Sequence, residues 1–237
     1  MGTLTMVKKL FILSMLGLGM LLVAGAAWAD SVPITNASFE NYNPLNYSCT
    51  PGCYNYSSTS NALVPGWSVN NGGSWQPTRW YFPTLPNGST VAYTINNSIS
   101  QLLTGETVQP NSIYDLGVYV GNRGDGANGL YTISLDTILN GVMTTLCTTG
   151  VLNANNIAAH TFQQEGCQYQ SGSTVPAGNL YLLFTAVSGQ LDVDNVTLTD
   201  PQVNVPEPSS LLLLGVGGML VLGAAFLNKK KSLPIAA

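Results

Sequence analysis

The middle of the chain is built from short runs of β-forming residues, with turn-forming residues between them. The clearest runs are 90–95, 113–120, 130–135, 180–185 and 191–198. Gly, Asn, Pro and Ser separate them, and the 3.6-residue apolar spacing of an amphipathic helix is hard to find. Strands with a turn about every eight to twelve residues are typical of β-sandwiches and jelly rolls. The sequence therefore predicts an all-β fold, a single β-sandwich jelly roll over residues 30–204.

Apolar segments at both ends of the 237-residue chain predict an exported protein. Residues 1–29 begin with a basic pair, Lys8 and Lys9, continue as an apolar run, and end on Ala27-Trp28-Ala29. This order is typical of a secretory signal peptide that is cleaved between Ala29 and Asp30. The alternative is an uncleaved membrane anchor, because the apolar run is long enough for one.

The C-terminal end carries a more specific arrangement. The triplet Pro206-Glu207-Pro208 is followed by an apolar run over residues 211–227 and by a basic cluster, Lys229-Lys230-Lys231. Seventeen residues at about 1.5 Å each reach roughly 25 Å, which suits a short transmembrane helix. Lysines tend to stay on the cytoplasmic side, so the body of the protein is expected outside.

This triplet, span and basic cluster resemble the PEP-CTERM sorting signal of Gram-negative bacteria over residues 205–231, within a C-terminal segment 205–237. The resemblance implies that an exosortase-type membrane protease processes the tail. It also implies a protein that is first anchored in the membrane by its C-terminal helix and then lies at the cell surface or in the extracellular matrix. Members of that family are often tied to exopolysaccharide, so extracellular polysaccharide is a second expected partner.

The body of the chain is acidic and poor in charge. Between residues 30 and 206 the only bases are Arg79 and Arg123, against ten acidic residues. Such a surface repels phosphate backbones, which argues against nucleic-acid binding. The chain has one histidine, His160, no Cys-x-x-Cys pair and no phosphate-binding loop, so nucleotide hydrolysis and a zinc site are both disfavoured.

All four cysteines lie in the part predicted to be exported: Cys49, Cys53, Cys147 and Cys167. Four cysteines allow three pairings. We favour the two local disulfides, Cys49–Cys53 across a Pro-Gly turn and Cys147–Cys167 across a longer loop.

Three short motifs follow one another in the body: Asn36-Ala37-Ser38-Phe39-Glu40, then Pro65-Gly66-Trp67, then Asp192-Val193-Asp194-Asn195-Val196. This order resembles the galactose-binding-like jelly rolls, which include several bacterial carbohydrate-binding modules, over most of residues 32–200. The resemblance implies that the first and last strands lie side by side and that a structural Ca²⁺ sits between Glu40 and Asp194.

Two neighbouring carboxylates repel each other, and a hard cation with oxygen ligands relieves that repulsion. Glu40 and Asp194 are therefore the candidate metal ligands, and Asp192 and Asn36 are weaker ones. The alternative is that both carboxylates only accept hydrogen bonds from backbone groups or from water.

Aromatic residues gather between positions 67 and 82. Sugar rings stack on exposed aromatic rings, so Trp75, Trp80 and Tyr81, with Arg79 beside them, form a candidate saccharide-binding platform. The alternative is packing in the core, which we expect for Trp67.

These features favour a non-catalytic exported protein that binds a neutral saccharide with its jelly roll. No catalytic residue is predicted, since His160 is expected to be a packing or surface residue and there is no Gly-x-Ser-x-Gly elbow. One alternative is a structural biofilm or matrix protein without a specific ligand. Another is a calcium-dependent jelly-roll enzyme, a lyase or a protein similar to the Stig cyclases of indole-alkaloid synthesis, which use an acidic residue as proton donor. The sequence alone matches no position to that catalytic acid.

The two terminal signals make a prediction about processing. Protein isolated from its native host should begin near Asp30 and should lack the residues that follow Pro206-Glu207-Pro208. Intact-mass analysis measures both ends at once. A mass that still includes residues 211–231 would contradict processing at the triplet.

Overall fold

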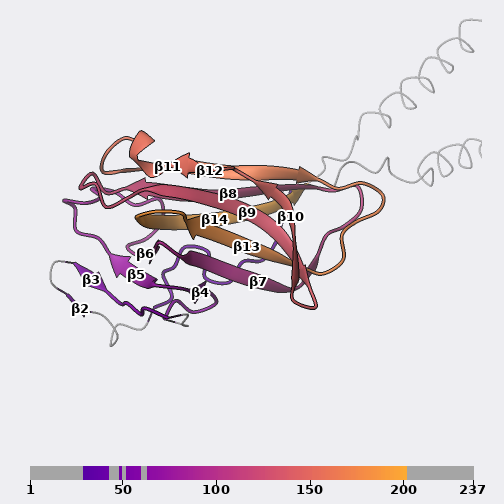
Figure 1. Ribbon diagram of the computed structural model, residues 1–237, viewed down its shortest axis with the longest axis horizontal. Coiled ribbons are helices and arrows are strands. Elements are labelled where there is room, and N and C mark those ends of the chain that lie inside the picture. The colour runs from indigo at the N-terminus through magenta and orange to yellow at the C-terminus, as the bar shows by residue number, and fades with distance from the viewer. Residues whose placement is uncertain (1–28, 43–47, 50–51, 60–62, 202–237) are drawn as a thin grey trace, which may run out of the picture.

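The computed structural model describes residues 29–42, 48–49, 52–59 and 63–201. They form two β-sheets that pack face to face as a sandwich (Figure 1). The predicted all-β sandwich is confirmed. The segments assigned to the signal peptide, to the sorting triplet and to the transmembrane helix 211–227 lie outside the described residues.

The first sheet has eight strands and the second has six, and neighbouring strands within each are antiparallel. The first sheet has the order β12 (Thr161–Gln170), β8 (Ile113–Asn122), β14 (Gln190–Pro201), β6 (Val91–Ile95), β5 (Gly72–Gln76), β3 (Cys53–Tyr54) and β2 (Ser48–Cys49), with β1 (Ala29–Ser31) beside β14. The second sheet has the order β10 (Val142–Thr148), β9 (Leu130–Leu139), β13 (Asn179–Ala186), β7 (Ser98–Thr107) and β4 (Ser68–Val69), with β11 (Leu152–Asn153) beside β9.

The described residues contain little helix. A three-residue 3-10 turn, η2 (Ala154–Asn156), follows β11. Within the ranges given above, the chain has no helix with the length and apolar character that a membrane crossing requires.

The core lies between the two sheets and follows the two-residue period of the strands. In β13, Leu180, Leu182 and Phe184 are buried, and the residues between them are more exposed. Trp67 packs against Phe184 with ring centroids 5.7 Å apart, as expected for a core tryptophan. This alternation places every second residue of a strand on the outer face of its sheet.

β14 breaks the simple alternation that its sequence suggests. An unbroken two-residue period would place Asn195 and Thr197 on the same face as Val193. Instead, the register with β8 shifts between Asp194 and Thr197, and Asn195 has a φ of 49°. This is a β-bulge, in which one extra residue turns the following side chains to the opposite face.

The bulge determines which side chains at the end of β14 face the core. Val196 and Leu198 join the core between the sheets. Asp192, Asp194 and Thr197 lie on the outer face of the first sheet, where Trp75 of β5 bonds to Asp192 and the loop between β5 and β6 bonds to Asp194. The first and last strands were expected to lie side by side, and β1 does pair with β14.

A disulfide joins the two sheets at one side of the sandwich. Cys147 on β10 and Cys167 on β12 are bonded, with their Cα atoms 5.8 Å apart, and both strands lie at sheet edges. Cys53 is also disulfide-bonded, and Cys49 is paired with it across β2 and β3, although the side chain of Cys49 lies outside the described residues.

The Cys147–Cys167 disulfide should stabilise the fold measurably. It closes a loop of 20 residues, and the chain-entropy model gives about 3 kcal/mol for such a loop. The double variant Cys147→Ser/Cys167→Ser should lower the free energy of unfolding in urea by about that amount. Each single serine variant serves as the control and should lose as much as the double variant. An unchanged unfolding midpoint in the double variant would show that the crosslink does not hold the sheets together.

Candidate functional site

The outer face of the first sheet carries a second apolar cluster, separate from the core. Trp75, Phe82, Val91 and Tyr93 are buried there, and Phe162 from β12 packs against them. We call these residues, together with Tyr81 and Trp80, the aromatic cluster. The loop between β5 and β6 supplies three of these seven residues, Trp80, Tyr81 and Phe82.

Gly121 of β8 leaves room on the sheet surface for two rings of the aromatic cluster. A Cβ at Gly121 of β8 would lie 2.8 Å from the rings of both Phe82 and Phe162. Those two rings contact each other with centroids 4.4 Å apart. Glycine at this position therefore lets the aromatic rings rest directly on the strand.

Asp192 lies beneath the aromatic cluster with none of its surface exposed. Its Oδ1 accepts hydrogen bonds from the indole Nε1 of Trp75 at 3.1 Å and from Nε2 of Gln190 at 2.7 Å. Its Oδ2 accepts one from Nδ2 of Asn128 at 2.9 Å. The carboxyl group is thus held by three neutral donors from three different segments, which fixes its orientation.

Arg123 covers this carboxyl group. Its guanidinium lies 4.6 Å from the centre of the Tyr81 ring and 5.1 Å from that of Trp75, a cation–π arrangement. Nη1 donates to Oε1 of Gln190 at 2.8 Å, and Nη2 forms an ion pair with Asp125 at 2.7 Å. Asp125, expected to be a turn residue, also accepts a hydrogen bond from the N–H of Ala127.

Burial is the main influence on the acidity of Asp192. Removal from water raises the pKa of the carboxyl group above its ordinary value of 3.8, while the nearby charge of Arg123 and the three hydrogen bonds lower it in part. The net direction is upward, so the protonated form is favoured more than in water. A buried carboxylic acid that keeps its proton is suited to proton donation.

His160 supports the aromatic cluster and does not act on Asp192 directly. It lies one residue before β12 begins and has a φ of 64°. Its Nδ1 lies 3.1 Å from the carbonyl oxygen of Tyr81. Its ring packs edge-on against Trp80, with centroids 6.0 Å apart. The histidine therefore anchors the loop that covers the site.

The second acidic residue of β14, Asp194, faces a different environment. Its Oδ2 accepts the N–H of Asn87 at 2.9 Å, and its Oδ1 accepts the N–H of Asn195 at 2.7 Å. Burial raises the pKa of Asp194 to about 7, the two backbone hydrogen bonds oppose this, and the charge of Glu40 adds to it.

Glu40 is held by the same loop. Its Oε1 accepts the N–H groups of Ser89 and Thr90 at 2.8 and 2.7 Å, and its Oε2 accepts the hydroxyl of Ser89 at 3.1 Å. Gly88 has a φ of 58°, and a Cβ there would lie 2.2 Å from the Glu40 carboxyl carbon. The loop 87–90 thus ties the two predicted metal ligands, Glu40 and Asp194, to one short segment.

The oxygen atoms near this loop have the chemistry that Ca²⁺ prefers, with two carboxylates and a hydroxyl. The hydroxyl belongs to Thr90, whose Oγ1 is buried and has no hydrogen-bond partner among the described residues. Within the same residues there is no group of three or more His, Cys, Asp or Glu side chains that could hold a metal. Carbonyl oxygens or water would have to complete a calcium shell. Asn36 does not serve it, since its side chain bonds to Asn41 and Pro65.

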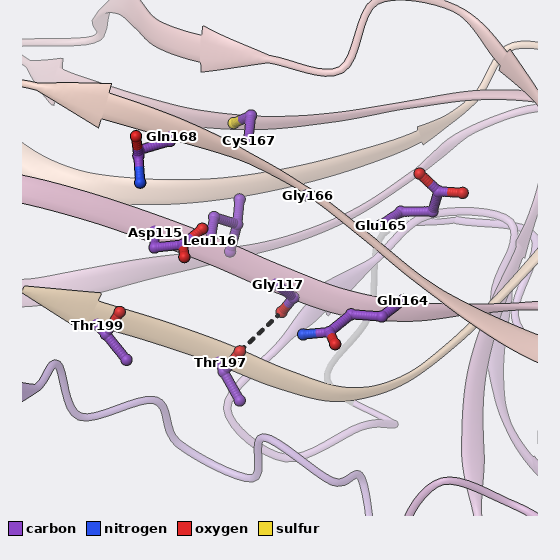
Figure 2. A pocket seen from close by; sticks show the side chains of 10 residues that line it. All are labelled: Asp115, Leu116, Gly117, Gln164, Glu165, Gly166, Cys167, Gln168, Thr197 and Thr199. Carbon is purple, nitrogen blue, oxygen red and sulfur yellow. Dashed lines mark hydrogen bonds between the residues drawn. The ribbon is translucent and has the colours of Figure 1, made fainter.

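The outer face continues away from Asp192 as an open hollow of about 570 Å³ between β8, β12 and β14. Figure 2 shows polar side chains around it, with the Thr197 hydroxyl donating to the carbonyl of Gly117 at 3.4 Å. Asp115 of β8 and Gln168 of β12 are paired residues on two neighbouring strands of its wall. None of the described residues that line this hollow is aromatic, so they offer no ring on which a sugar could stack.

Of the four residues predicted to bind a saccharide, the structure brings three together. Trp75 is buried and Tyr81 is half-buried, with ring centroids 5.4 Å apart, and Trp80 packs edge-on against Tyr81. Trp80 is 65% exposed, and Arg79 is also exposed. The indole of Trp75, one of the three rings of the predicted platform, instead donates its hydrogen bond to Asp192.

The family of the chain follows from a model that matches residues 30–199, the HpiC1-like model described as HpiC1 cyclase. The chain belongs to this family of cyclases. A second model, the PEP-CTERM protein-sorting motif, matches residues 204–230. The protein is therefore exported, anchored in the membrane before exosortase processing, and then found at the cell surface or outside the cell.

Two solved cyclases from Fischerella have similar structures. The apo form of a Fischerella sp. cyclase has a TM-score of 0.58 and 22% identity, over 76% of this chain and 100% of that one. A cyclase from Fischerella sp. TAU has a TM-score of 0.55 and 21% identity, over 75% and 100%. Both show that the fold is shared.

A carbohydrate-binding module is less similar. The CBM22-1 xylan-binding domain of Paenibacillus barcinonensis Xyn10C has a TM-score of 0.45 and 12% identity, over 76% of this chain and 99% of that domain. No protein of curated function matches the chain significantly.

The family membership corrects the functional interpretation drawn from the sequence. A non-catalytic saccharide-binding protein is wrong, and the enzyme alternative similar to the Stig cyclases is favoured. The physical reason is visible in Trp75, which is buried and bonded to a buried acid, whereas a sugar-stacking platform requires exposed rings.

Sequence reasoning missed most of this site. Asp192 was considered only as a weak calcium ligand, and Asn128 and Gln190 were not singled out. Arg123 was counted only as a charge, although it is one of two bases in a body of ten acids. A base in a charge-poor body is a candidate partner for an acidic residue, and that signal could have singled out Arg123.

Proposed function

We propose that residues 30–204 form an exported cyclase domain in which Asp192 is the catalytic acid. The observation that carries the proposal is a fully buried carboxyl group with a raised pKa, set among aromatic rings in a chain of the HpiC1 cyclase family. Hydrogen bonds from Trp75, Asn128 and Gln190 hold the group in one orientation.

The proposed reaction is an acid-catalysed ring closure. The Asp192 carboxyl group gives its proton to an unsaturated carbon or a heteroatom of the substrate, which becomes a cation. A π bond of the same molecule attacks the cationic centre and closes the ring, and a proton lost from the ring returns to the carboxylate. Substrate and product are then isomers of equal mass, and no oxidant or reductant is required.

The surroundings of Asp192 suit a cationic intermediate. The faces of Trp75 and Tyr81 already stabilise one delocalised cation, the guanidinium of Arg123, at 5.1 and 4.6 Å. Because Asp192 is not exposed at all, a substrate has to displace part of its cover. Arg123, whose side chain is 16% exposed, is a part of this cover that reaches solvent.

Calcium belongs to this proposal as a structural ion. Glu40 and Asp194 would hold it, and its role would be to fix the loop 87–90 against β14. That loop connects directly to β6, whose Val91 and Tyr93 belong to the aromatic cluster. The support is the like-charge pair of carboxylates and the unpartnered hydroxyl of Thr90 beside them.

The catalytic role predicts a specific chemical phenotype. In a host that makes the native product, Asp192→Asn should lower its formation by about 10²–10⁴-fold, the usual contribution of a general acid. An uncyclised isomer of the same mass should accumulate, and the purified wild-type protein should convert it to the missing product. Mass spectrometry with chromatographic separation of isomers measures both.

The matched control for Asp192→Asn is Asp115→Asn, which removes an exposed carboxylate from the same face of the same sheet. It should leave product formation unchanged. Circular dichroism checks that both variants are folded. Normal product formation by a folded Asp192→Asn protein would refute the catalytic assignment.

The raised pKa of Asp194 predicts that the stability of the folded protein falls as pH rises, and that calcium removes this pH dependence. The pKa of Asp194 is raised in the folded protein from 3.8 to about 7. Its contribution to stability is therefore complete below the pKa of the unfolded state, and it is lost as pH rises towards the pKa of the folded state. In chelator, the melting temperature should therefore fall between pH 4 and pH 7. Calcium should restore it at pH 8 by binding the ionised carboxylates, with about 2.7 kcal/mol at a hundredfold excess over Kd.

Asp194→Asn should flatten the pH dependence in chelator and remove the response to calcium, while Asp115→Asn should retain both. Differential scanning calorimetry at several pH values gives the comparison. If calcium leaves the melting temperature of the wild-type protein unchanged at pH 8, Glu40 and Asp194 do not form a calcium site.

A further inference from the structure

The turn between β9 and β10 extends beyond the core and exposes large apolar side chains. Leu139, Val142 and Met143 are 48%, 68% and 49% exposed. Asn140 and Gly141 between the strands have φ values of 51° and 79°, the left-handed pair of a tight two-residue hairpin turn. We call residues 138–143 the hairpin tip.

The hairpin tip lies at the same end of the sandwich as the exit of the chain. Ile138, the first residue of the tip, pairs with Asn179 of β13. On its other side, Asn179 pairs with Thr107 at the end of β7. Five residues, 108–112, connect β7 to β8, and Asp115 of β8 pairs with Thr199 of β14. The last residues of β14 and the paired strand β1 are therefore at this end.

The segment that follows β14 brings a membrane to this end. The described chain stops at residue 201, and the PEP-CTERM motif matches residues 204–230. Nine residues, 202–210, separate β14 from the apolar run at 211. At about 3.3–3.6 Å per residue, they reach roughly 30 Å at most. Before exosortase processing, this end of the sandwich is thus kept close to the bilayer surface.

The chemistry of the hairpin tip fits a lipid surface. Residues 137–164 contain no Asp, Glu, Lys or Arg, although the body of the domain is strongly acidic. An acidic surface is repelled by anionic lipids, whereas an uncharged tip is not. A hollow of about 380 Å³ beside the tip, lined by Leu139, Val142, Pro176 and Ala177 among others, adds apolar surface. Clusters of exposed apolar side chains mark sites of interaction with proteins or membranes.

We propose that, in the anchored protein, the hairpin tip inserts into the interfacial layer of the membrane that holds the sorting segment. Asp192 lies nine residues from the end of β14, close to the opposite end of the sandwich. At about 3.3 Å per residue, this places the acid roughly 30 Å from the membrane end. The site then opens to the aqueous side, so its substrate arrives from solution and not from the bilayer.

Depth-dependent fluorescence on the full-length protein tests this. The variant Val142→Cys carries an environment-sensitive NBD label at the hairpin tip. Val151→Cys carries the same label at the opposite end, where its exposure is a comparable 61%. Both are reconstituted in vesicles of phosphatidylethanolamine and phosphatidylglycerol. The measurements are quenching by iodide in solution and by a doxyl group attached to the lipid acyl chain.

The label at position 142 should be quenched several-fold more by the lipid-borne doxyl group than the label at 151, and several-fold less by iodide. Equal quenching at both positions would overturn the proposal. Protection of position 142 from iodide without quenching by lipid would also overturn it, because that pattern means contact with another protein, such as a second copy of the chain.

A second pair of variants separates insertion from simple proximity. With the label moved to Asn140→Cys, the changes Leu139→Ser and Met143→Ser should reduce quenching by lipid several-fold. The control changes Val151→Ser and Val187→Ser remove apolar groups that are 61% and 50% exposed at the other end, and they should have no effect. If the tip changes leave lipid quenching intact, the tether alone accounts for the proximity.

Discussion

A carboxyl group buried on the face of a sheet has to be hydrogen-bonded, and the outer layer of this protein is organised around that requirement. Asp192 accepts from Trp75 of β5, from Asn128 in the loop after β8, and from Gln190 at the start of β14. Each donor ties down one segment, and Arg123 closes the arrangement by bonding to Gln190. A buried acid without these partners would cost several kcal/mol. The aromatic cluster excludes water from the acid, and the acid in turn orients the tryptophan.

The bulge at Asn195 separates Asp192 and Asp194 from the second half of β14. Before it, Asp192 and Asp194 share the outer face by the ordinary two-residue period. After it, Val196 and Leu198 return to the core. The strand thus supports two charged groups on one face without losing apolar contacts further along. The two acids also differ in surroundings, since Asp192 has neutral donors and a nearby cation, whereas Asp194 faces the like charge of Glu40.

The sandwich itself was predictable because it depends on local patterns. The β-forming runs 180–185 and 191–198, with turn residues before and between them, were enough to predict β13 and β14. The site was not, because its contacts join residues far apart in sequence, such as Trp75 and Asp192. The bulge at Asn195 depends on tertiary contacts in the same way. Clustered tryptophans predicted an important surface, but only the structure shows that Trp75 faces inward to an acid while Trp80 faces solvent.

The two ends of the sandwich have different chemistry, because the strand order gathers different connections at each end. Antiparallel strands put the connections β8–β9, β10–β12 and β13–β14 at the end near Asp192, where the loops carry Arg123, Asn128 and His160. The other end holds the β9–β10 turn, the start of β8 and the end of β14. The loops at the first end hold polar and charged groups in fixed positions around one acid. The second end needs no such precision, so its turn can remain apolar and uncharged beside the segment that leads to the membrane. A domain tethered at the end opposite its site keeps that site accessible to dissolved substrate throughout sorting.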